Sequence, residues 1–382
     1  MDKKNKILML IAGLGLSGTP RVMMDIIENL SRDQFEISVA YKPEFPGFED
    51  DLLDPLKKLG IEAIALRGKH LLSITGLWDL YNYVRSNSVR IIHCWDDLCI
   101  AGRILKPVTG CRIIETFGNP VTSKGTHLFY LLNKITSILM DGMIFVSEGV
   151  ERSFRQSDIL IFGNDTKTKV IYNVLNLRNI PEYSSETRAQ IRKRFGFHKH
   201  EVILLNLGML NPQKSQENLI AALPHVLADD QKIRLVIVGC GEREQILRDH
   251  IRALHLEDHV FLAGKRQRQE VFEILSMADI YVSSSLWEGL PIAVLEAMAF
   301  RLPVVATDVI GNREAVSNLE TGLLVPPGDP GTLGKAIRTL VRDKEFRNRM
   351  GTSGRRRIEA FFHPDHFIRE HELFYMSILN KN

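Results

Sequence analysis

Residues 278–296 read Ala-Asp-Ile-Tyr-Val-Ser-Ser-Ser-Leu-Trp-Glu-Gly-Leu-Pro-Ile-Ala-Val-Leu-Glu. The run Ala278–Ser285 has the composition of a buried strand. Pro291 follows where a helix would begin, a position that suits proline because the N–H group there has no helical partner. Up to Phe300 every face of the expected helix is apolar except at Glu296, which predicts that the helix is buried.

Two carboxylates, Glu288 and Glu296, are separated by seven uncharged residues in this stretch. A buried carboxylate requires hydrogen-bond donors or a cation. The free N–H groups of Gly289 and Leu290, with the positive end of the helix dipole, are expected to point out of the helix start. The pattern indicates a pocket for a ligand rich in hydroxyl groups and negative charge. The alternative is a structural ion pair or a helix cap.

Short apolar runs alternate with amphipathic stretches along the chain, which indicates βαβ units and parallel sheets. Thirteen strands are expected, more than one ordinary open sheet holds. The predicted fold class is therefore α/β, with two Rossmann-like, doubly wound parallel-sheet domains facing a central cleft. Ligands bind beyond the carboxyl ends of such strands, so the cleft is the expected site. The expected strands are Ile7–Ile11, Phe35–Ala40, Glu62–Leu66, Arg90–Cys94, Arg112–Thr116, Met143–Ser147, Val170–Tyr172, Val202–Leu207, Arg234–Val238, Val260–Leu262, Asp279–Ser283, Pro303–Thr307 and Gly322–Val325.

The length of 382 residues also favours two domains. The composition changes at Leu177–His200, which we interpret as a linker and the first helix of the second domain. We predict an N-terminal acceptor-binding domain at 1–177 and a C-terminal nucleotide-sugar-binding domain at 178–362. Residues 363–382 are expected to form a helix that packs back on the N-terminal domain, with Phe367, Phe374 and Ile378 on one side.

The net charge of +3 and the absence of a long basic run give no indication of nucleic-acid binding. The four cysteines lack zinc-ligand spacing and are interpreted as small buried side chains in a reducing compartment, so a cytoplasmic protein is expected. No apolar run reaches the ~18 residues of a membrane span. Basic residues of the N-terminal half would permit peripheral contact with anionic lipid at the cytoplasmic face of a membrane. They are Arg103, Lys106, Arg112, Lys124 and Lys134.

The chain resembles the retaining glycosyltransferases of family 4, which have the GT-B fold of two Rossmann-like domains. The Glu288-x7-Glu296 pair matches the signature of that family, and the C-terminal half matches almost throughout. The N-terminal half matches mainly in the order of its elements. The other matching motifs are Leu207-Gly208-Met209-Leu210 with Gln213-Lys214, Val238-Gly239-Cys240-Gly241, Ala278-Asp279-Ile280, Thr321-Gly322-Leu323-Leu324-Val325 and the loop from Gly15 to Arg21.

The resemblance implies a role for each matched residue of the C-terminal half. Lys214 would hold the pyrophosphate of a nucleotide-sugar donor as a point charge, although a lone lysine can also be a solvated surface residue. Glu296 would accept hydrogen bonds from the ribose. Glu288 would contact hydroxyl groups of the donor sugar, with the N–H groups of Gly289 and Leu290 nearby.

One departure from the family pattern lies beside Lys214. Met209 stands where the family usually has an arginine, which removes one cation from the expected diphosphate clamp. Lys265, Arg266 and Arg268 are candidates to compensate, or else they are surface charges or lie along the base of the nucleotide.

In the N-terminal half, a glycine loop ends in Ser17-Gly18-Thr19-Pro20 before an expected helix, and its N–H groups could approach a phosphate. The family usually has a histidine after the strand Arg112–Thr116, and this chain has none there. His93, His127 and Asn119 are candidates to fill that place, and His93 and Asn119 are the candidates for contact with the acceptor. A hydrogen-bonded structural role is equally consistent for His93.

The resemblance implies a hexosyltransferase that retains the anomeric configuration by front-face displacement. The donor would be a nucleotide-diphosphate sugar, most often a UDP-sugar. The acceptor would be a glycan, a lipid-linked sugar or a small molecule, in polysaccharide or glycoconjugate biosynthesis. No cofactor and no metal are expected. One alternative, motivated by Met209 and the missing histidine, is a non-catalytic GT-B subunit that binds a sugar-nucleotide or a partner protein. The first loop has G-x-G-x-x-G spacing at Gly13, Gly15 and Gly18, but a nicotinamide-dependent oxidoreductase is disfavoured because no acidic residue stands out at the end of the strand Phe35–Ala40.

Overall fold

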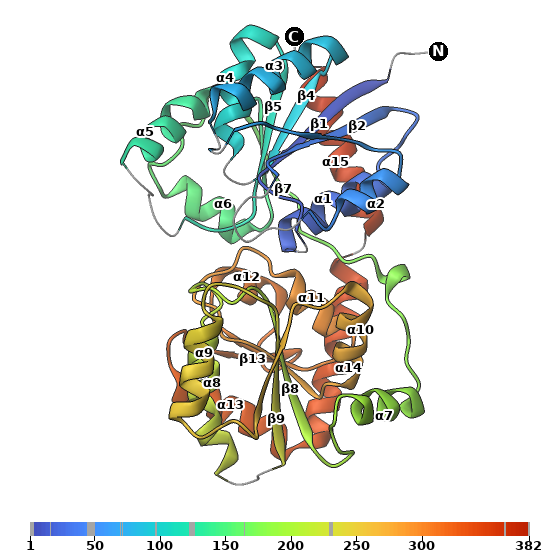
Figure 1. Cartoon of the computed structure of the whole chain (residues 1–382), viewed down its shortest axis with the longest axis vertical. Helices are drawn as coiled ribbons and strands as arrows, with labels where there is room; N and C mark the ends of the chain where they lie inside the picture. Colours follow the sequence, from blue (N-terminus) through green and yellow to red (C-terminus); the bar gives the residue numbers. More distant parts are fainter. Residues whose placement is uncertain are drawn as a thin grey trace. The chain divides into compact units, whose positions relative to one another are not determined.

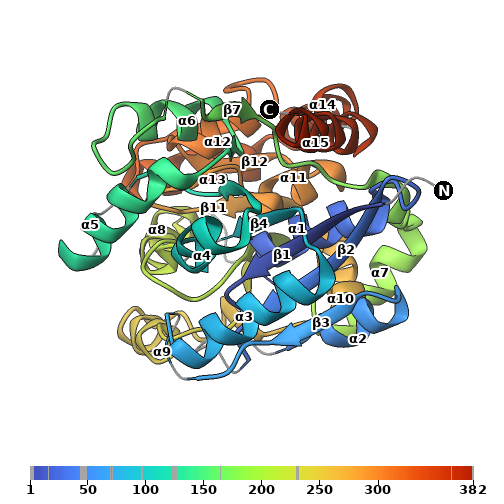
Figure 2. The same cartoon turned by 90° about the horizontal axis from the view of Figure 1, so that it is seen from above.

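The computed structural model describes residues 4–15, 17–43, 50–68, 70, 72–95, 98–121, 127–163, 165–228, 232–362 and 364–380. The chain forms two compact units, both of which contain a parallel sheet covered by helices (Figures 1 and 2). The N-terminal unit consists of residues 1–173 and 364–382, and the C-terminal unit of residues 174–363.

The N-terminal unit contains a seven-stranded sheet in the order β3-β2-β1-β4-β5-β6-β7. Its chain order reverses direction between β1 and β4, which is the topological switch point where open α/β sheets bind ligands. The strands are β1 (Asn5–Ile11), β2 (Phe35–Tyr41), β3 (Glu62–Ala65), β4 (Ile91–Trp95), β5 (Arg112–Phe117), β6 (Gly142–Phe145) and β7 (Lys167–Val170). The helices are α1 (Gly18–Asn29), α2 (Leu53–Lys58), α3 (Ile74–Asn87), α4 (Cys99–Thr109), α5 (His127–Thr136), the 3-10 turn η2 (Ser137–Leu139), α6 (Glu148–Arg155) and α15 (Pro364–Leu379).

The C-terminal unit contains a six-stranded sheet in the order β10-β9-β8-β11-β12-β13, with its switch point between β8 and β11. Helices α8, α9 and α13 cover one face, and α10, α11 and α14 cover the other (Figure 1). The strands are β8 (Val202–Leu207), β9 (Ile233–Val238), β10 (Val260–Gly264), β11 (Ile280–Ser283), β12 (Val304–Thr307) and β13 (Gly322–Val325). The helices are the 3-10 turn η3 (Leu177–Asn179), α7 (Ser185–Arg194), α8 (Gln216–Leu227), α9 (Glu244–Ala253), α10 (Arg268–Met277), α11 (Ile292–Ala299), α12 (Ile310–Ala315), α13 (Pro330–Arg342) and α14 (Lys344–Phe361).

The predicted fold class is confirmed, and the described residues contain the thirteen strands in the expected order. The largest shift is at β7, which is Lys167–Val170 rather than Val170–Tyr172. This strand lies at the edge of its sheet and is only partly buried, so it tolerates lysines that made the segment look unlike a strand. Helix α11 begins at Ile292 with Pro291 as its N-cap, one residue later than expected.

Helix α15 packs into the N-terminal unit, and its apolar side includes the expected Phe367, Phe374 and Ile378. The fully buried Tyr375 lies 5.8 Å from the ring of Phe35, measured between ring centroids. Gly142 leaves the space for this packing, because a Cβ atom there would lie 2.8 Å from the Phe374 ring. The helix therefore closes one face of the first sheet from a distant part of the sequence.

Candidate functional site

The two glutamates and the lysine of the sequence motifs lie at the switch point of the second sheet. The loop after β8 carries Lys214, and the loop after β11 carries Glu288. Their side chains form an ion pair with 2.5 Å between Lys214 Nζ and Glu288 Oε1. The same carboxylate oxygen accepts a hydrogen bond from Ser285 Oγ at 2.6 Å, and Gln213 Nε2 lies 3.4 Å from the other oxygen. Lys214 and Glu288 are therefore brought together in one polar cluster, in which Glu288 is buried and Lys214 is partly exposed.

Backbone contacts hold the two loops in register. Leu286 N donates to Gln213 O at 2.8 Å, and Ser284 Oγ donates to Lys214 O at 2.9 Å. Gln213 Nε2 also donates to Trp287 O at 2.9 Å. The positions of Lys214 and Glu288 are thus fixed by neighbouring loops of parallel strands rather than by the ion pair alone.

The loop that carries Glu288 rests on the start of α12. Gly311 N donates to Glu288 O at 3.0 Å. A Cβ atom at Gly311 would lie 2.5 Å from Gly289 O and 2.9 Å from Leu290 N, so only glycine allows this approach. Both Gly289 and Leu290 are buried. The peptide between them is therefore positioned from beneath by a helix that the sequence analysis did not connect with the site.

Glu296 lies on α11, is buried as predicted, and has a cation partner. Its carboxylate forms an ion pair with Arg268, the first residue of α10. The Arg268 guanidinium also lies over the ring of Phe272, 4.1 Å from its centroid, and remains partly exposed. Sequence reasoning grouped Arg268 with the candidate diphosphate ligands, whereas the structure places it on the carboxylate assigned to the ribose.

Both carboxylates affect the hydroxyl group of Tyr281 on β11 electrostatically. Burial raises the pKa of its hydroxyl, and the negative charges of Glu288 and Glu296 raise it further. The hydroxyl donates to Leu207 O at 3.3 Å, at the end of β8. The neutral tyrosine therefore links the two central strands beneath the site.

Close backbone contacts explain the glycine motif after β9. Gly239 has a φ of +145°, and a Cβ atom there would lie 1.9 Å from Gly208 O. At Gly241 a Cβ atom would lie 2.4 Å from Leu210 O. Leu210 N donates to Cys240 O at 2.9 Å. The loops after β8 and β9 thus pack backbone against backbone at the carboxyl edge of the sheet.

The remaining predicted donor contacts follow β8 and β10. Met209 lies in the loop between Gly208 and Lys214, and its carbonyl accepts a hydrogen bond from Gln216 Nε2 at 3.0 Å. Arg266 pairs with Glu270 at 3.1 Å along the start of α10, and the neighbouring Lys265 is half-buried.

Asp279, part of another family motif, lies at the opposite end of its strand. Its carboxylate accepts from Arg192 Nη2 at 2.7 Å and from Ile203 N at 2.8 Å. These bonds fix α7 and the start of β8. Asp279 therefore stabilises the fold and does not belong to the cluster at the carboxyl edge.

In the N-terminal unit, the first loop and the loop after β5 lie close together at the carboxyl edge. Ser17 is the N-cap of α1, and its side chain makes no capping hydrogen bond. A Cβ atom at Gly18 would have no heavy atom within 4 Å. A Cβ atom at Gly118 would lie 3.9 Å from Thr19 Oγ1, which places the exposed Asn119 near the start of α1. The two loops that carry these candidate residues are thus neighbours.

His93 lies in the core and is fully buried. Its Nδ1 lies 2.8 Å from Tyr375 Oη and its Nε2 lies 2.7 Å from Thr116 Oγ1, so both ring nitrogens are engaged. Burial lowers its pKa, and so does the nearby His371. Of its two alternatives, the structure supports the hydrogen-bonded structural role, joining β4, β5 and α15.

The basic residues expected to contact anionic lipid are largely engaged within the protein. Arg103 is buried in an ion pair with Glu115. Lys106 and Arg112 share Asp141, at 2.8 and 3.1 Å. Lys134 lies 3.8 Å from Asp158, and Lys124 lies outside the described residues. The buried Arg103 is therefore removed from the expected lipid contacts, whereas Lys106, Arg112 and Lys134 stay partly exposed and their contact with anionic lipid remains a prediction.

The cysteines follow the expectation with one exception. Cys94, Cys99 and Cys111 are buried, whereas Cys240 is exposed because it lies at the turn after β9. Within the described part of the chain, no group of three or more His, Cys, Asp or Glu side chains could hold a metal ion. Among the same residues, no helix is both long enough and apolar enough to span a membrane.

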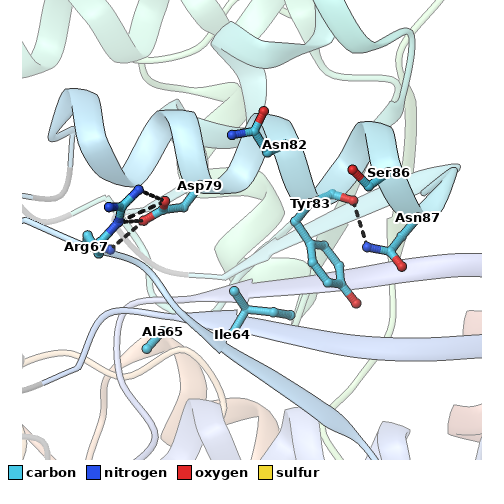
Figure 3. A pocket seen from close by; sticks show the side chains of 8 residues that line it. All are labelled: Ile64, Ala65, Arg67, Asp79, Asn82, Tyr83, Ser86 and Asn87. Carbon is cyan, nitrogen blue, oxygen red and sulfur yellow. Dashed lines mark hydrogen bonds and ion pairs between the residues drawn. The ribbon is translucent and has the colours of Figure 1, made fainter.

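A pocket of about 420 Å³ lies between β3 and α3 of the N-terminal unit (Figure 3). Arg67 and Asp79 form a bidentate pair at one end, and Asn87 Nδ2 donates to Tyr83 O at the other. None of the predicted site residues lines it. We therefore do not assign it to the predicted reaction.

Comparison with known proteins agrees with this architecture. Residues 187–357 match the family described as Glycosyl transferases group 1. The UDP-Gal:alpha-D-GlcNAc-diphosphoundecaprenol alpha-1,3-galactosyltransferase of Escherichia coli is 25% identical over 86% of both chains. The N-acetyl-alpha-D-glucosaminyl L-malate synthase of Bacillus anthracis is 27% identical over 55% of this chain and 54% of that one. The chain spans between 54% and 74% of the length of the first three curated relatives that it matches.

Solved structures share the whole fold. Anabaena Alr3699/HepE in complex with UDP and glucose has a TM-score of 0.84 and 19% identity, over 98% of this chain and all of that one. The sucrose-phosphate synthase of Thermosynechococcus elongatus has a TM-score of 0.82 and 21% identity, over 98% and 99% of the two chains. The chain therefore has the GT-B fold. The part of its C-terminal unit that matches the Glycosyl transferases group 1 model includes Lys214, Glu288 and Glu296.

Proposed function

We propose that the protein is a retaining, metal-independent glycosyltransferase of family 4 that takes a sugar from a nucleotide-diphosphate donor. The observation that carries this proposal is the ion pair of the partly exposed Lys214 with the buried Glu288 at the switch point of the second sheet. A cation, a carboxylate with a remaining acceptor position, and neighbouring backbone amides suit a diphosphate and a sugar.

Lys214 is assigned to the diphosphate. Its ammonium group has three donors, and one of them is directed to Glu288. The other two remain for phosphate oxygens, so Glu288 would orient the lysine without occupying it. The positive charge would stabilise the leaving diphosphate as the bond to the sugar breaks.

Glu288 is assigned to the sugar hydroxyl groups. An ionised carboxylate has about four lone-pair positions. Lys214 and Ser285 use two on Oε1, and Gln213 lies within reach of one on Oε2. One position is left for a hydroxyl donor of the sugar. Glu296 would receive the ribose hydroxyl groups, with Arg268 moving aside or sharing the carboxylate.

We further propose UDP as the carrier, because the fold neighbours include complexes with UDP and UDP-glucose. For the acceptor we propose a lipid-linked sugar, in the synthesis of a polysaccharide or glycoconjugate. The E. coli relative is named for a diphosphoundecaprenol-linked acceptor and aligns with 86% of this chain. A mannosyltransferase of Corynebacterium glutamicum, 29% identical over 58% of this chain, is named for a phosphatidylinositol-linked one. A lipid-linked acceptor also favours peripheral contact with the cytoplasmic membrane face.

The test combines calorimetry with a transfer assay across a panel of nucleotide-sugars. Wild type is expected to bind UDP and to hydrolyse or transfer one UDP-sugar without added metal, and with added chelator. Glu296→Gln should weaken UDP binding by ~1–2 kcal/mol, because a charge-assisted hydrogen bond becomes a neutral one. Glu288→Ala should reduce turnover far more than UDP affinity. UDP binding without turnover of any donor would instead support the alternative of a non-catalytic GT-B subunit. That alternative arises because Met209 stands where the family usually has an arginine.

A further inference from the structure

An aliphatic stripe lies on the outer side of α5 and the turn η2. It consists of Leu128, Leu131, Ile135 and Ile138, whose exposed fractions are 68%, 50%, 55% and 59%. Their spacing of three, four and three residues puts them on one side of the helix. Large aliphatic side chains this exposed, gathered within eleven residues, indicate a binding surface rather than scattered surface residues.

Neighbouring elements also expose aliphatic side chains and are joined to the turn η2 by hydrogen bonds. Val108 on α4 is 57% exposed, and Ile161 is 40% exposed. Lys106 Nζ of α4 donates to Leu139 O at 2.9 Å, and Ile161 N donates to Ser137 Oγ at 2.8 Å. Helices α4 and α5 lie side by side at the margin of the N-terminal unit (Figures 1 and 2). The aliphatic side chains therefore project from a rigid support.

Charge around the stripe is low. Glu115 is the only acidic residue between Leu98 and Met140, and it is buried against Arg103. The described basic side chains of this segment are engaged in the ion pairs given above. The exposed carboxylate of Asp158 also lies beside α5, where Lys134 Nζ is 3.8 Å away, so the surface offers apolar contact with little net charge.

We propose that the aliphatic stripe inserts into the interfacial layer of a phospholipid bilayer and docks the N-terminal unit on it by apolar contact. The inference rests on the proposed function, because an acceptor carried by lipid must be met at the bilayer surface. A helix with one aliphatic side lies in the plane of the interface with that side buried among the acyl chains. Binding of this kind needs little anionic lipid and resists salt.

The size of the surface favours a bilayer over a second copy of the chain. Full burial of an aliphatic side chain corresponds to roughly 60–120 Å² at the usual transfer coefficient. The stripe with Val108 and Ile161 therefore adds up to about 400 Å² at most. A stable protein interface buries ~800 Å² on each partner. The stripe falls well short of that area, whereas an interfacial helix needs only its own exposed side.

The test is sedimentation of the full chain with vesicles of phosphatidylcholine, alone or mixed with phosphatidylglycerol, at low and high salt. Wild type is expected to bind both vesicles with little effect of salt. The double variant Leu131→Ser/Ile135→Ser should bind at least about tenfold more weakly. A matched variant, Leu59→Ser/Ile74→Ser, removes exposed aliphatic side chains of the same unit and should bind as wild type does. Equal melting temperatures show that all three remain folded.

Three outcomes would overturn the proposal. Binding only to phosphatidylglycerol, with release by salt, would show electrostatic docking. A wild-type dimer that the stripe variant converts to monomer would show a second copy as the occupant. Equal binding of the stripe and matched variants would place the contact elsewhere. UDP calorimetry on the same preparations separates this question from the proposed function, because the stripe variant should bind UDP like wild type.

Discussion

Gly311→Ala tests whether the peptide between Gly289 and Leu290 lies at the reacting groups. The new Cβ atom would stand 2.5 Å from Gly289 O, against 3.4 Å for an ordinary contact, so the loop must shift by about 0.9 Å. Misplacement of about 1 Å at a reacting centre can cost ~10²-fold in rate. We therefore expect turnover of the UDP-sugar to fall by about that factor. Overpacking should also lower the free energy of unfolding by ~1–3 kcal/mol.

Gly354→Ala is the matched control. Gly354 is also helical, on α14, and its nearest neighbour would be a Met298 side-chain atom at 3.6 Å. Alanine there should leave turnover unchanged and stabilise the helix by up to ~1 kcal/mol. The assay is turnover at saturating donor, with urea unfolding of both variants. Wild-type turnover in a folded Gly311→Ala protein would refute the reasoning, because the loop could then shift without affecting the reaction.

Three further predictions address the charges of the two units. Lys214→Ala should reduce transfer by ~10²–10³-fold, since one preorganised donor to the leaving group is lost. Adding Met209→Arg to this variant should restore part of the transfer activity, whereas adding Met209→Leu should restore none. Near-normal activity of Lys214→Ala would show that another residue binds the diphosphate. Arg268→Gln should tighten UDP binding in calorimetry, because the ribose no longer competes with a guanidinium for Glu296, and weaker binding would contradict this. Burial lowers the pKa of His371 to about 4. As the pH falls, His371 is therefore protonated near pH 6.5 in the unfolded chain but only near pH 4 in the folded chain. This contribution to the stability of the N-terminal unit is therefore full above pH 6.5 and lost as pH falls towards 4, by up to ~3 kcal/mol, as urea unfolding across this range should show. A His371→Gln variant should reduce the pH dependence and leave the part that belongs to His93.

The architecture was predictable because strand periodicity is a local property. Apolar runs such as Val202–Leu207 are buried on both faces and stand out from their surroundings, whereas the edge strand at Lys167–Val170 does not. Lys214 and Glu288 were assigned to one site by the resemblance to family 4, and their ion pair agrees with the rule that ligands bind where parallel strands end.

Partners that depend on tertiary contacts were not predictable. Nothing in the sequence around Arg268 shows that it pairs with Glu296, because 28 residues separate them and either could have met another charge. Gly311 carries no motif, so its support of the Glu288 loop emerges only from the packing of α12. His93 looked available for contact with the acceptor because it was expected at the end of a strand. In the structure, α15 from the far end of the sequence covers it.

The place of α15 has a consequence for how the chain is made. The seven strands of the first sheet emerge from the ribosome long before residues 364–379 are synthesised. The roughly 190 residues of the other unit are made in the meantime. At ~5–20 residues per second, the first unit waits on the order of 10–40 s for its last helix. During that interval the apolar surface that Tyr375 and Phe374 will cover is open to water, to chaperones and to other nascent chains. The unit that starts first is completed last.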